Sequence, residues 1–226
     1  MKEMNSFGDN NLVHYEGILG VFDYDPEEFE VRKIWYHEYL HYHGNGKSVD
    51  LPEGCTDTSY MFSECKLPEG FSLGEHFDTS NVTYMHSMFR FCKIPDDFSL
   101  GERFDTSNVW NMASMFGECT LPKDFTLGEH FDTSNVTDMS FMFSECKLPE
   151  GFSLGEHFDT SKVTNMRGMF ESCKLPEDFS LGEKFDTSNV TYMSDMFGGC
   201  SYGNSDIHDY FKTQSDIEII KKLRKH

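Results

Sequence analysis

The stretch FDTSNVTYMHSMFRFC, residues 77–92, decides the fold because it returns along the chain at a constant spacing. It recurs as FDTSNVWNMASMFGEC at residues 104–119 and as FDTSNVTDMSFMFSEC at residues 131–146, and two further copies end at Cys173 and Cys200. Each copy ends 27 residues after the one before it, with no insertion, which gives five full units: residues 66–92, 93–119, 120–146, 147–173 and 174–200. A fixed period between about 20 and 50 residues predicts an array of stacked repeats.

Each unit reads as one turn of such an array. About a third of the first unit is apolar and is expected to face inward: Leu67, Phe71, Leu73, Phe77, Val82, Met85, Met88, Phe89 and Cys92. The alternation around Phe71 and Leu73 predicts a short strand, and the carboxylate of Asp78 suits an Asx-turn, in which it accepts a backbone N–H two residues on. No unit contains a run long enough for an amphipathic helix. The pattern therefore predicts a mainly β protein, a right-handed β solenoid.

The repeated string resembles the FDTSNVT-x-M-x-x-MF-x-x-C repeat of BspA-like leucine-rich-repeat proteins, which are found mainly in bacterial surface proteins. The resemblance covers roughly residues 56–200, and a longer LPEGFSLGEH segment lies between the Cys and the Phe-Asp of each repeat here. It implies a leucine-rich-repeat-like ββ superhelix with a role in adhesion or protein recognition and no catalysis.

Three segments are expected along the chain. Residues 1–48 form an N-terminal β-rich capping module, with turns at Asp25-Pro26 and at residues 44–46. Residues 49–200 hold one partial and five full repeats. Residues 201–226 form a C-terminal helical cap, because Ser215 and Glu218 have capping-box spacing and the last residues are rich in Lys and Arg.

Composition and charge exclude several classes. The chain has 226 residues and a formal charge of −20, which excludes a polycation that coats nucleic acid, so no direct nucleic-acid binding is expected. Its 38% hydrophobic residues, 22 Phe among them, can fill a core. No apolar stretch approaches the ~20 residues of a membrane span, and the first residues lack the apolar segment of a signal peptide. We expect a soluble cytoplasmic protein whose seven cysteines are thiols.

Two patterns raise the question of a metal site. The sequence HEYLH, residues 37–41, fits the H-E-x-x-H pattern of zinc metallopeptidases, but its aromatic flanks favour a strand, in which Glu38 would point away from His37 and His41. The repeated cysteines, Cys65 to Cys200, are expected to form an interior ladder of small apolar side chains without zinc-binding spacing. We therefore expect no enzyme, no metal and no cofactor, with the zinc peptidase as a third, disfavoured hypothesis.

The acidic residues recur as columns, which a stacked array would turn into two ladders. These are Asp78, Asp105, Asp132, Asp159 and Asp186, and Glu75, Glu102, Glu129, Glu156 and Glu183. A basic column follows the Glu ladder: His76, Arg103, His130, His157 and Lys184. The ladders could bind Ca²⁺, imitate the phosphates of nucleic acid, or keep a Phe-rich protein in solution.

In other columns the residue type varies between units, and several of these variable positions hold aromatic residues. The candidate protein-binding residues are Tyr84, His86, Phe91, Trp110, Phe141, Arg167 and Tyr192. Surface aromatic side chains are typical of contact surfaces. The sequence thus predicts a non-catalytic protein that binds another protein through these columns. The alternative is an acidic inhibitor that imitates nucleic acid and blocks a DNA- or RNA-binding protein, for example a phage counter-defence factor.

Overall fold

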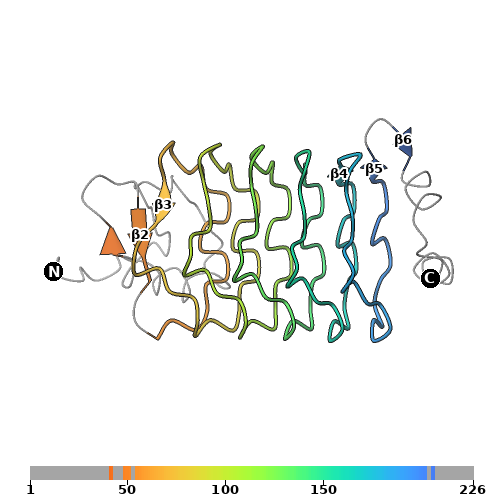
Figure 1. Cartoon of the computed structure of the whole chain (residues 1–226), viewed down its shortest axis with the longest axis horizontal. Helices are drawn as coiled ribbons and strands as arrows, with labels where there is room; N and C mark the ends of the chain where they lie inside the picture. Colours follow the sequence, from red (N-terminus) through yellow and green to blue (C-terminus); the bar gives the residue numbers. More distant parts are fainter. Residues whose placement is uncertain (1–40, 43–47, 52–53, 203–204, 207–226) are drawn as a thin grey trace, which may run out of the picture.

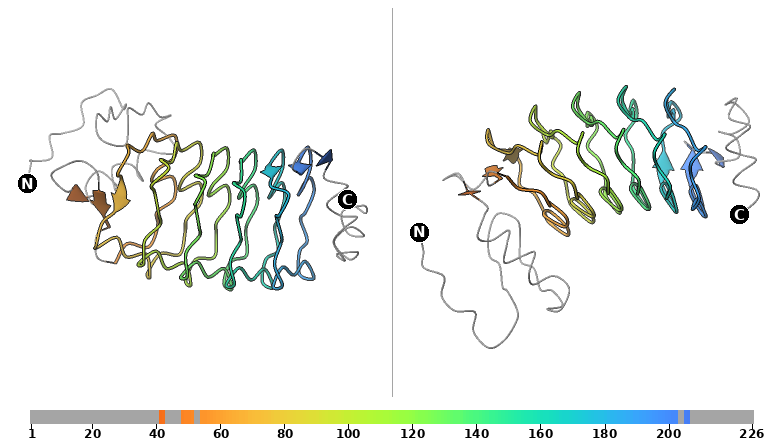
Figure 2. Two further views of the ribbon diagram at one scale, coloured as in Figure 1. Left: turned by 45° about the horizontal axis from the view of Figure 1, so that its top comes forward. Right: turned by 90° about the horizontal axis from the view of Figure 1, so that it is seen from below.

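The computed structural model describes residues 41–42, 48–51, 54–202 and 205–206. Within them six short strands occur: β1 (His41–Tyr42), β2 (Ser48–Asp50), β3 (Ser72–Leu73), β4 (Lys174–Leu175), β5 (Ser201–Tyr202) and β6 (Ser205–Asp206). Between β3 and β4 the units lie side by side in sequence order along the long axis of the molecule (Figure 1). Figure 2 shows the same regular succession from two other directions.

Neighbouring units are joined by parallel bridges between residues 27 positions apart. One row of bridges joins Asp57, Tyr84, Asn111, Asp138, Asn165 and Tyr192 in this order, and a second joins Lys66, Lys93, Thr120, Lys147 and Lys174. At the bridge between Tyr84 and Asn111, for example, the amide of Met85 donates to the carbonyl of Asn111 at 3.0 Å. Because every unit pairs in the same register, an inserted residue would displace all later side chains, which accounts for the unbroken 27-residue period.

The core consists of the repeated apolar columns, as the sequence predicts. Val82, Met85, Met88 and Phe89 are fully buried in the first unit, whereas Leu73 is only partly buried. One Phe of each unit stacks on its counterpart, with centroids 5.1 to 5.7 Å apart, and the stack contains Phe62, Phe89, Phe116, Phe143, Phe170 and Phe197. This buried stack stabilises the register between units, since each ring contacts its counterpart in the next unit.

A buried polar column runs beside the Phe stack. The hydroxyl of Thr79 donates to the carbonyl of Asp105 at 2.7 Å, and Thr106, Thr133 and Thr160 repeat this bond at 2.8 to 2.9 Å. Each of these Thr side chains is fully buried. The bond satisfies both the hydroxyl and a carbonyl of the next unit, so that neither is left unpaired in the interior.

The two ends of the array carry small mixed sheets. At the start, β1 pairs antiparallel with β2, and β2 pairs in parallel with β3. At the end, β4 pairs in parallel with β5, which pairs antiparallel with β6. The strand predicted at Phe71–Leu73 thus exists in the first unit, where β2 provides a partner, and the described residues of the later units have no strand there. Most of the predicted N-terminal module and the predicted C-terminal helix lie outside the described residues.

Candidate interaction surface

In each unit, several side chains between the residue before the bridge row and the residue before the cysteine reach the surface. We call the surface that they form the variable face. In the first unit it consists of Thr83, Tyr84, His86, Arg90 and Phe91, together with the column that begins at the buried Ser87, and the other units contribute the residues at 27-residue steps. The large hydrophobic side chains that are exposed among the described residues all lie on it: Tyr84, Phe91, Trp110 and Tyr192.

Tyr84 and Trp110 form an aromatic pair on this face. Their ring centroids lie 4.4 Å apart and their planes meet at 64°, an edge-to-face contact between neighbouring units. Tyr84 is 37% exposed and Trp110 40% exposed, so the contact leaves much of both rings in solvent. The sequence predicts both residues as binding residues, and the structure brings them together.

Tyr84 stands where other units have a side chain that bonds the backbone. At its position in the bridge row, four other units have an Asp or Asn whose Oδ1 accepts the backbone N–H two residues on, at 2.9 to 3.1 Å; the residues are Asp57, Asn111, Asp138 and Asn165. A tyrosine cannot accept this bond. The first unit therefore has an aromatic ring where these four units have a side-chain acceptor.

Trp110 replaces a second backbone-bonding side chain. At the equivalent position, the hydroxyl of a threonine donates to a carbonyl of the preceding unit at 3.0 to 3.2 Å; the residues are Thr83, Thr137, Thr164 and Thr191. Tryptophan keeps the backbone bond to Thr83 and loses the side-chain bond. Two neighbouring positions of the repeat thus depart from the residue type found in other units, and in both cases the replacement is aromatic.

Two phenylalanines of the face adopt the left-handed backbone conformation, which bulky residues rarely enter. Phe91 has φ 58° and Phe141 has φ 56°. An arginine lies over each ring: the guanidinium carbon of Arg90 is 4.7 Å from the Phe91 centroid, and that of Arg167 is 5.5 Å from the Phe141 centroid. The sequence prediction missed Arg90, which also pairs with Glu118 at 2.9 Å.

The ring of Phe141 is accommodated by Gly168 of the next unit. A Cβ at Gly168 would lie 2.4 Å from the Phe141 ring, closer than two carbon atoms can approach. Phe141 is consequently half-buried, unlike the exposed Phe91. Gly168 was not predicted as a site residue, although it is the single glycine in a column that otherwise reads Ser87, Ser114, Phe141 and Asp195.

The remaining predicted residues lie apart from the aromatic pair. His86 is half-buried and its Nε2 lies 2.7 Å from the hydroxyl of Tyr60 in the preceding unit. Tyr192, 68% exposed, occupies the bridge row four units after Tyr84. At about 4.8 Å per step these two rings are about 19 Å apart. The predicted residues are therefore spread along the face rather than gathered in one pocket.

The Asp ladder has a structural task. Each carboxylate accepts the backbone N–H of the Ser two residues on, at 2.7 to 2.9 Å, as the Asx-turn prediction requires. Hydrogen bonds from Ser80, together with Arg103, hold the pKa of Asp78 below its usual value, and hydrogen bonds from Ser161 do so for Asp159. The Glu ladder is exposed along its whole length. No group of His, Cys, Asp or Glu suited to a metal ion occurs in the described part of the chain.

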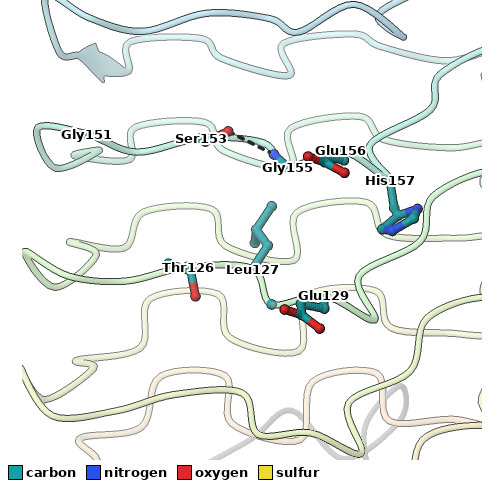
Figure 3. A pocket seen from close by; sticks show the side chains of 9 residues that line it. Thr126, Leu127, Glu129, Gly151, Ser153, Gly155, Glu156 and His157 are labelled. Atoms are coloured by element: carbon teal, nitrogen blue, oxygen red, sulfur yellow. Dashed lines mark hydrogen bonds between the residues drawn. The ribbon is translucent and has the colours of Figure 1, made fainter.

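A hollow of about 610 Å³ opens between the third and fourth units beside the Glu ladder. Its lining residues are Thr126, Leu127, Gly128, Glu129, Gly151, Ser153, Gly155, Glu156 and His157. Figure 3 shows Glu129, Glu156 and His157 toward one side of it, and the bond from the Gly155 amide to the Ser153 hydroxyl lies next to Glu156. A hollow of about 360 Å³ lies at the same positions between the first and second units. Because hollows occur at equivalent positions of different units, they follow from the geometry of the repeat.

The repeated cysteines are buried free thiols. Burial raises the pKa of Cys119 to about 12, and the thiol donates to the carbonyl of Phe89 at 2.8 Å. These side chains behave as part of the core, in agreement with the prediction. The HEYLH sequence lies outside the described residues apart from the backbone of His41.

Comparison with known proteins gives one match. The family model described as "Mycoplasma protein of unknown function, DUF285" matches residues 56–150 and 153–222, and thus most of the chain. No curated protein and no solved structure matches. Among the described residues, no helix has the length and apolar character that a membrane crossing requires.

Proposed function

The chain belongs to the DUF285 family of Mycoplasma proteins of unknown function, and from that premise we propose that it is a non-catalytic repeat protein that binds another protein through the variable face. We further propose that its fold is a right-handed β solenoid related to BspA-like leucine-rich repeats. The period, the uninterrupted register and the stacked Phe column support this fold class.

One observation carries the proposed function. Tyr84 and Trp110 contact each other at 4.4 Å, and each replaces a side chain that bonds the backbone in other units. Selection for stability alone favours the Asn and Thr of the neighbouring units, since each adds a hydrogen bond worth roughly 0.5–1.5 kcal/mol. Residues that break a local rule without a structural gain are characteristic of functional sites. Exposed Trp and Tyr are also the side chains that dominate the energetics of protein interfaces.

The test is affinity capture with the tagged full-length chain from the source cell, quantified by mass spectrometry. The informative variants restore the repeat rule: Tyr84→Asn and Trp110→Thr, singly and together. Both insert residues that the same array accommodates elsewhere, so folding is preserved. The proposal requires a partner that the parent captures and the double variant loses.

A matched control changes the Glu ladder. Glu129→Gln with Glu156→Gln removes two exposed charges beside the hollow and leaves the variable face intact. Under the proposal this control retains the partner. A partner that the control loses and that the Tyr84→Asn, Trp110→Thr variant retains would instead indicate the acidic inhibitor that imitates nucleic acid.

A further inference from the structure

We propose that the Tyr84–Trp110 pair accepts an arginine- or lysine-containing segment of the partner protein. This inference rests on the proposed function and adds the chemical class of the partner. It follows from the charge of the variable face, from two contacts within that face, and from the order of residues along the bridge row.

The variable face is acidic. Between residues 54 and 202 it carries seven acidic side chains against two arginines, Arg90 and Arg167. The acidic residues are Asp57, Glu64, Glu118, Asp138, Glu145, Glu171 and Asp195. A surface of this composition attracts cationic segments and repels nucleic acid, because interface potentials are complementary in sign. It therefore favours a basic protein segment over an RNA or DNA ligand.

The same face already binds guanidinium groups to aromatic rings. Arg90 lies over Phe91 and Arg167 lies over Phe141, both within the ~6 Å at which a cation is attracted to a ring face. Among the described residues no cation occupies the Tyr84–Trp110 pair in this way, and Trp has the strongest attraction for a cation of the three aromatic types. The pair thus offers to a partner the contact that the two phenylalanines make within the chain.

Carboxylates follow the pair in the row of bridges. Asp57 bridges to Tyr84 on one side, and on the other side Asn111 and then Asp138 continue the row. At about 4.8 Å per step, Asp57 lies one step from Tyr84 and Asp138 two steps, or about 10 Å. In an extended peptide, every second side chain is on the same face at a spacing of about 6.6 Å. A segment with alternating basic residues that runs along the row can place one cation on the rings and the next beside a carboxylate.

The test uses a defined probe and the full-length chain. A rhodamine-labelled peptide of sequence GRGRGRG and its counterpart GEGEGEG are titrated with the protein at 50 mM NaCl, and binding is followed by fluorescence anisotropy. We expect saturable binding of the arginine peptide and none of the glutamate peptide. Loss of a cation–π contact of about 1 kcal/mol corresponds to about a fivefold rise in Kd, which is the minimum expected for Tyr84→Asn and for Trp110→Thr.

The control is again Glu129→Gln with Glu156→Gln, for which Kd should change less than twofold. No binding of the arginine peptide overturns the inference, and so does an equal loss of affinity in the control, which would indicate diffuse attraction to an acidic protein. The proposed function is tested separately. If a cellular partner depends on Tyr84 and Trp110 but the arginine peptide does not compete with it, the proposed binding surface is retained and the inference of a basic partner is wrong.

Discussion

Tyr84 and Trp110 belong to neighbouring units and meet edge to face, with ring centroids 4.4 Å apart. They lie one residue apart in the repeat, so that Tyr84 occupies the bridge row and Trp110 the position before it. In four other units the Tyr84 position holds Asn or Asp, and in four other units the Trp110 position holds a Thr, and these side chains bond the backbone. The contact therefore exists because aromatic residues in two adjacent units replace residues whose side chains bond the backbone in other units. This relationship gives predictions about stability and about binding.

Replacing Tyr84 with Asn should stabilise the protein. The Asn side chain can accept the backbone N–H of His86, as Asn111 accepts that of Ala113 at 3.0 Å. We expect the free energy of unfolding to rise by about 0.5–1.5 kcal/mol, the net value of one such hydrogen bond. The measurement is urea denaturation followed by circular dichroism. The reciprocal change Asn165→Tyr, which removes the bond to Arg167, should lower stability by a similar amount. If Tyr84→Asn destabilises the chain, the ring has a structural role.

The Phe stack should be essential for folding. Phe116 is fully buried, and its centroid lies 5.5 Å from that of Phe89 and 5.7 Å from that of Phe143. Truncation to Ala removes contacts to both neighbouring units and leaves a cavity, which costs about 3–5 kcal/mol. Urea denaturation of Phe116→Ala should show this loss, while the exposed Phe91→Ala should lose less than about 1 kcal/mol. Similar losses at both positions would contradict the distinction between core and face.

The sequence alone predicts the interior of the array well. A constant 27-residue period places Val82, Met85, Met88 and Phe89 in columns, and the structure buries all four completely. The Asx-turn at Asp78 is also predictable, because a carboxylate two residues before a backbone N–H needs only local geometry. Such features depend on the repeat itself, so they can be derived from one unit. The classification as a β solenoid stays a proposal.

The candidate site was predictable only in part. The sequence indicates Tyr84 and Trp110 as irregular aromatic residues, but their contact depends on how one unit is displaced from the next. Most residues in the column of Tyr84 are Asn or Asp, such as Asn111, and this recurrence was a signal in the sequence that the position favours a local side-chain hydrogen bond. The packing of the Phe141 ring over Gly168 was harder to predict from the sequence. It depends on a left-handed backbone conformation that no local pattern predicts for phenylalanine.

The Asp ladder should make stability depend on pH. Hydrogen bonds from Ser80 and from Ser161 lower the folded-state pKa of Asp78 and Asp159 below the unfolded value. A lowered folded pKa gives stability that is present above the unfolded pKa, near pH 4, and is lost as the pH falls through the folded pKa. Thermal denaturation between pH 5 and pH 3 should show a smaller fall in Tm for the Asp78→Asn, Asp159→Asn variant than for the parent. An identical fall would mean that these carboxylates titrate as free groups.

The core thiols should be unreactive in the folded state. Burial raises the pKa of Cys119 and of Cys200 to about 12, and the thiols of Cys92, Cys146 and Cys173 are buried as well. Only the thiolate is nucleophilic, so modification by a disulfide reagent at pH 8 requires unfolding. We expect the modification rate in increasing urea to follow the unfolding transition. Rapid modification of Cys119 in the absence of urea, located by mass spectrometry, would contradict its burial.

The central claim is that the Tyr84–Trp110 pair exists for binding and not for stability. The most direct measurement compares the parent with the Tyr84→Asn, Trp110→Thr double variant in two assays, urea denaturation and affinity capture of the partner. The account predicts a free energy of unfolding equal to or above that of the parent together with a loss of at least 90% of the captured partner. A double variant that unfolds more easily, or that is equally stable and captures the partner as well as the parent does, would contradict it.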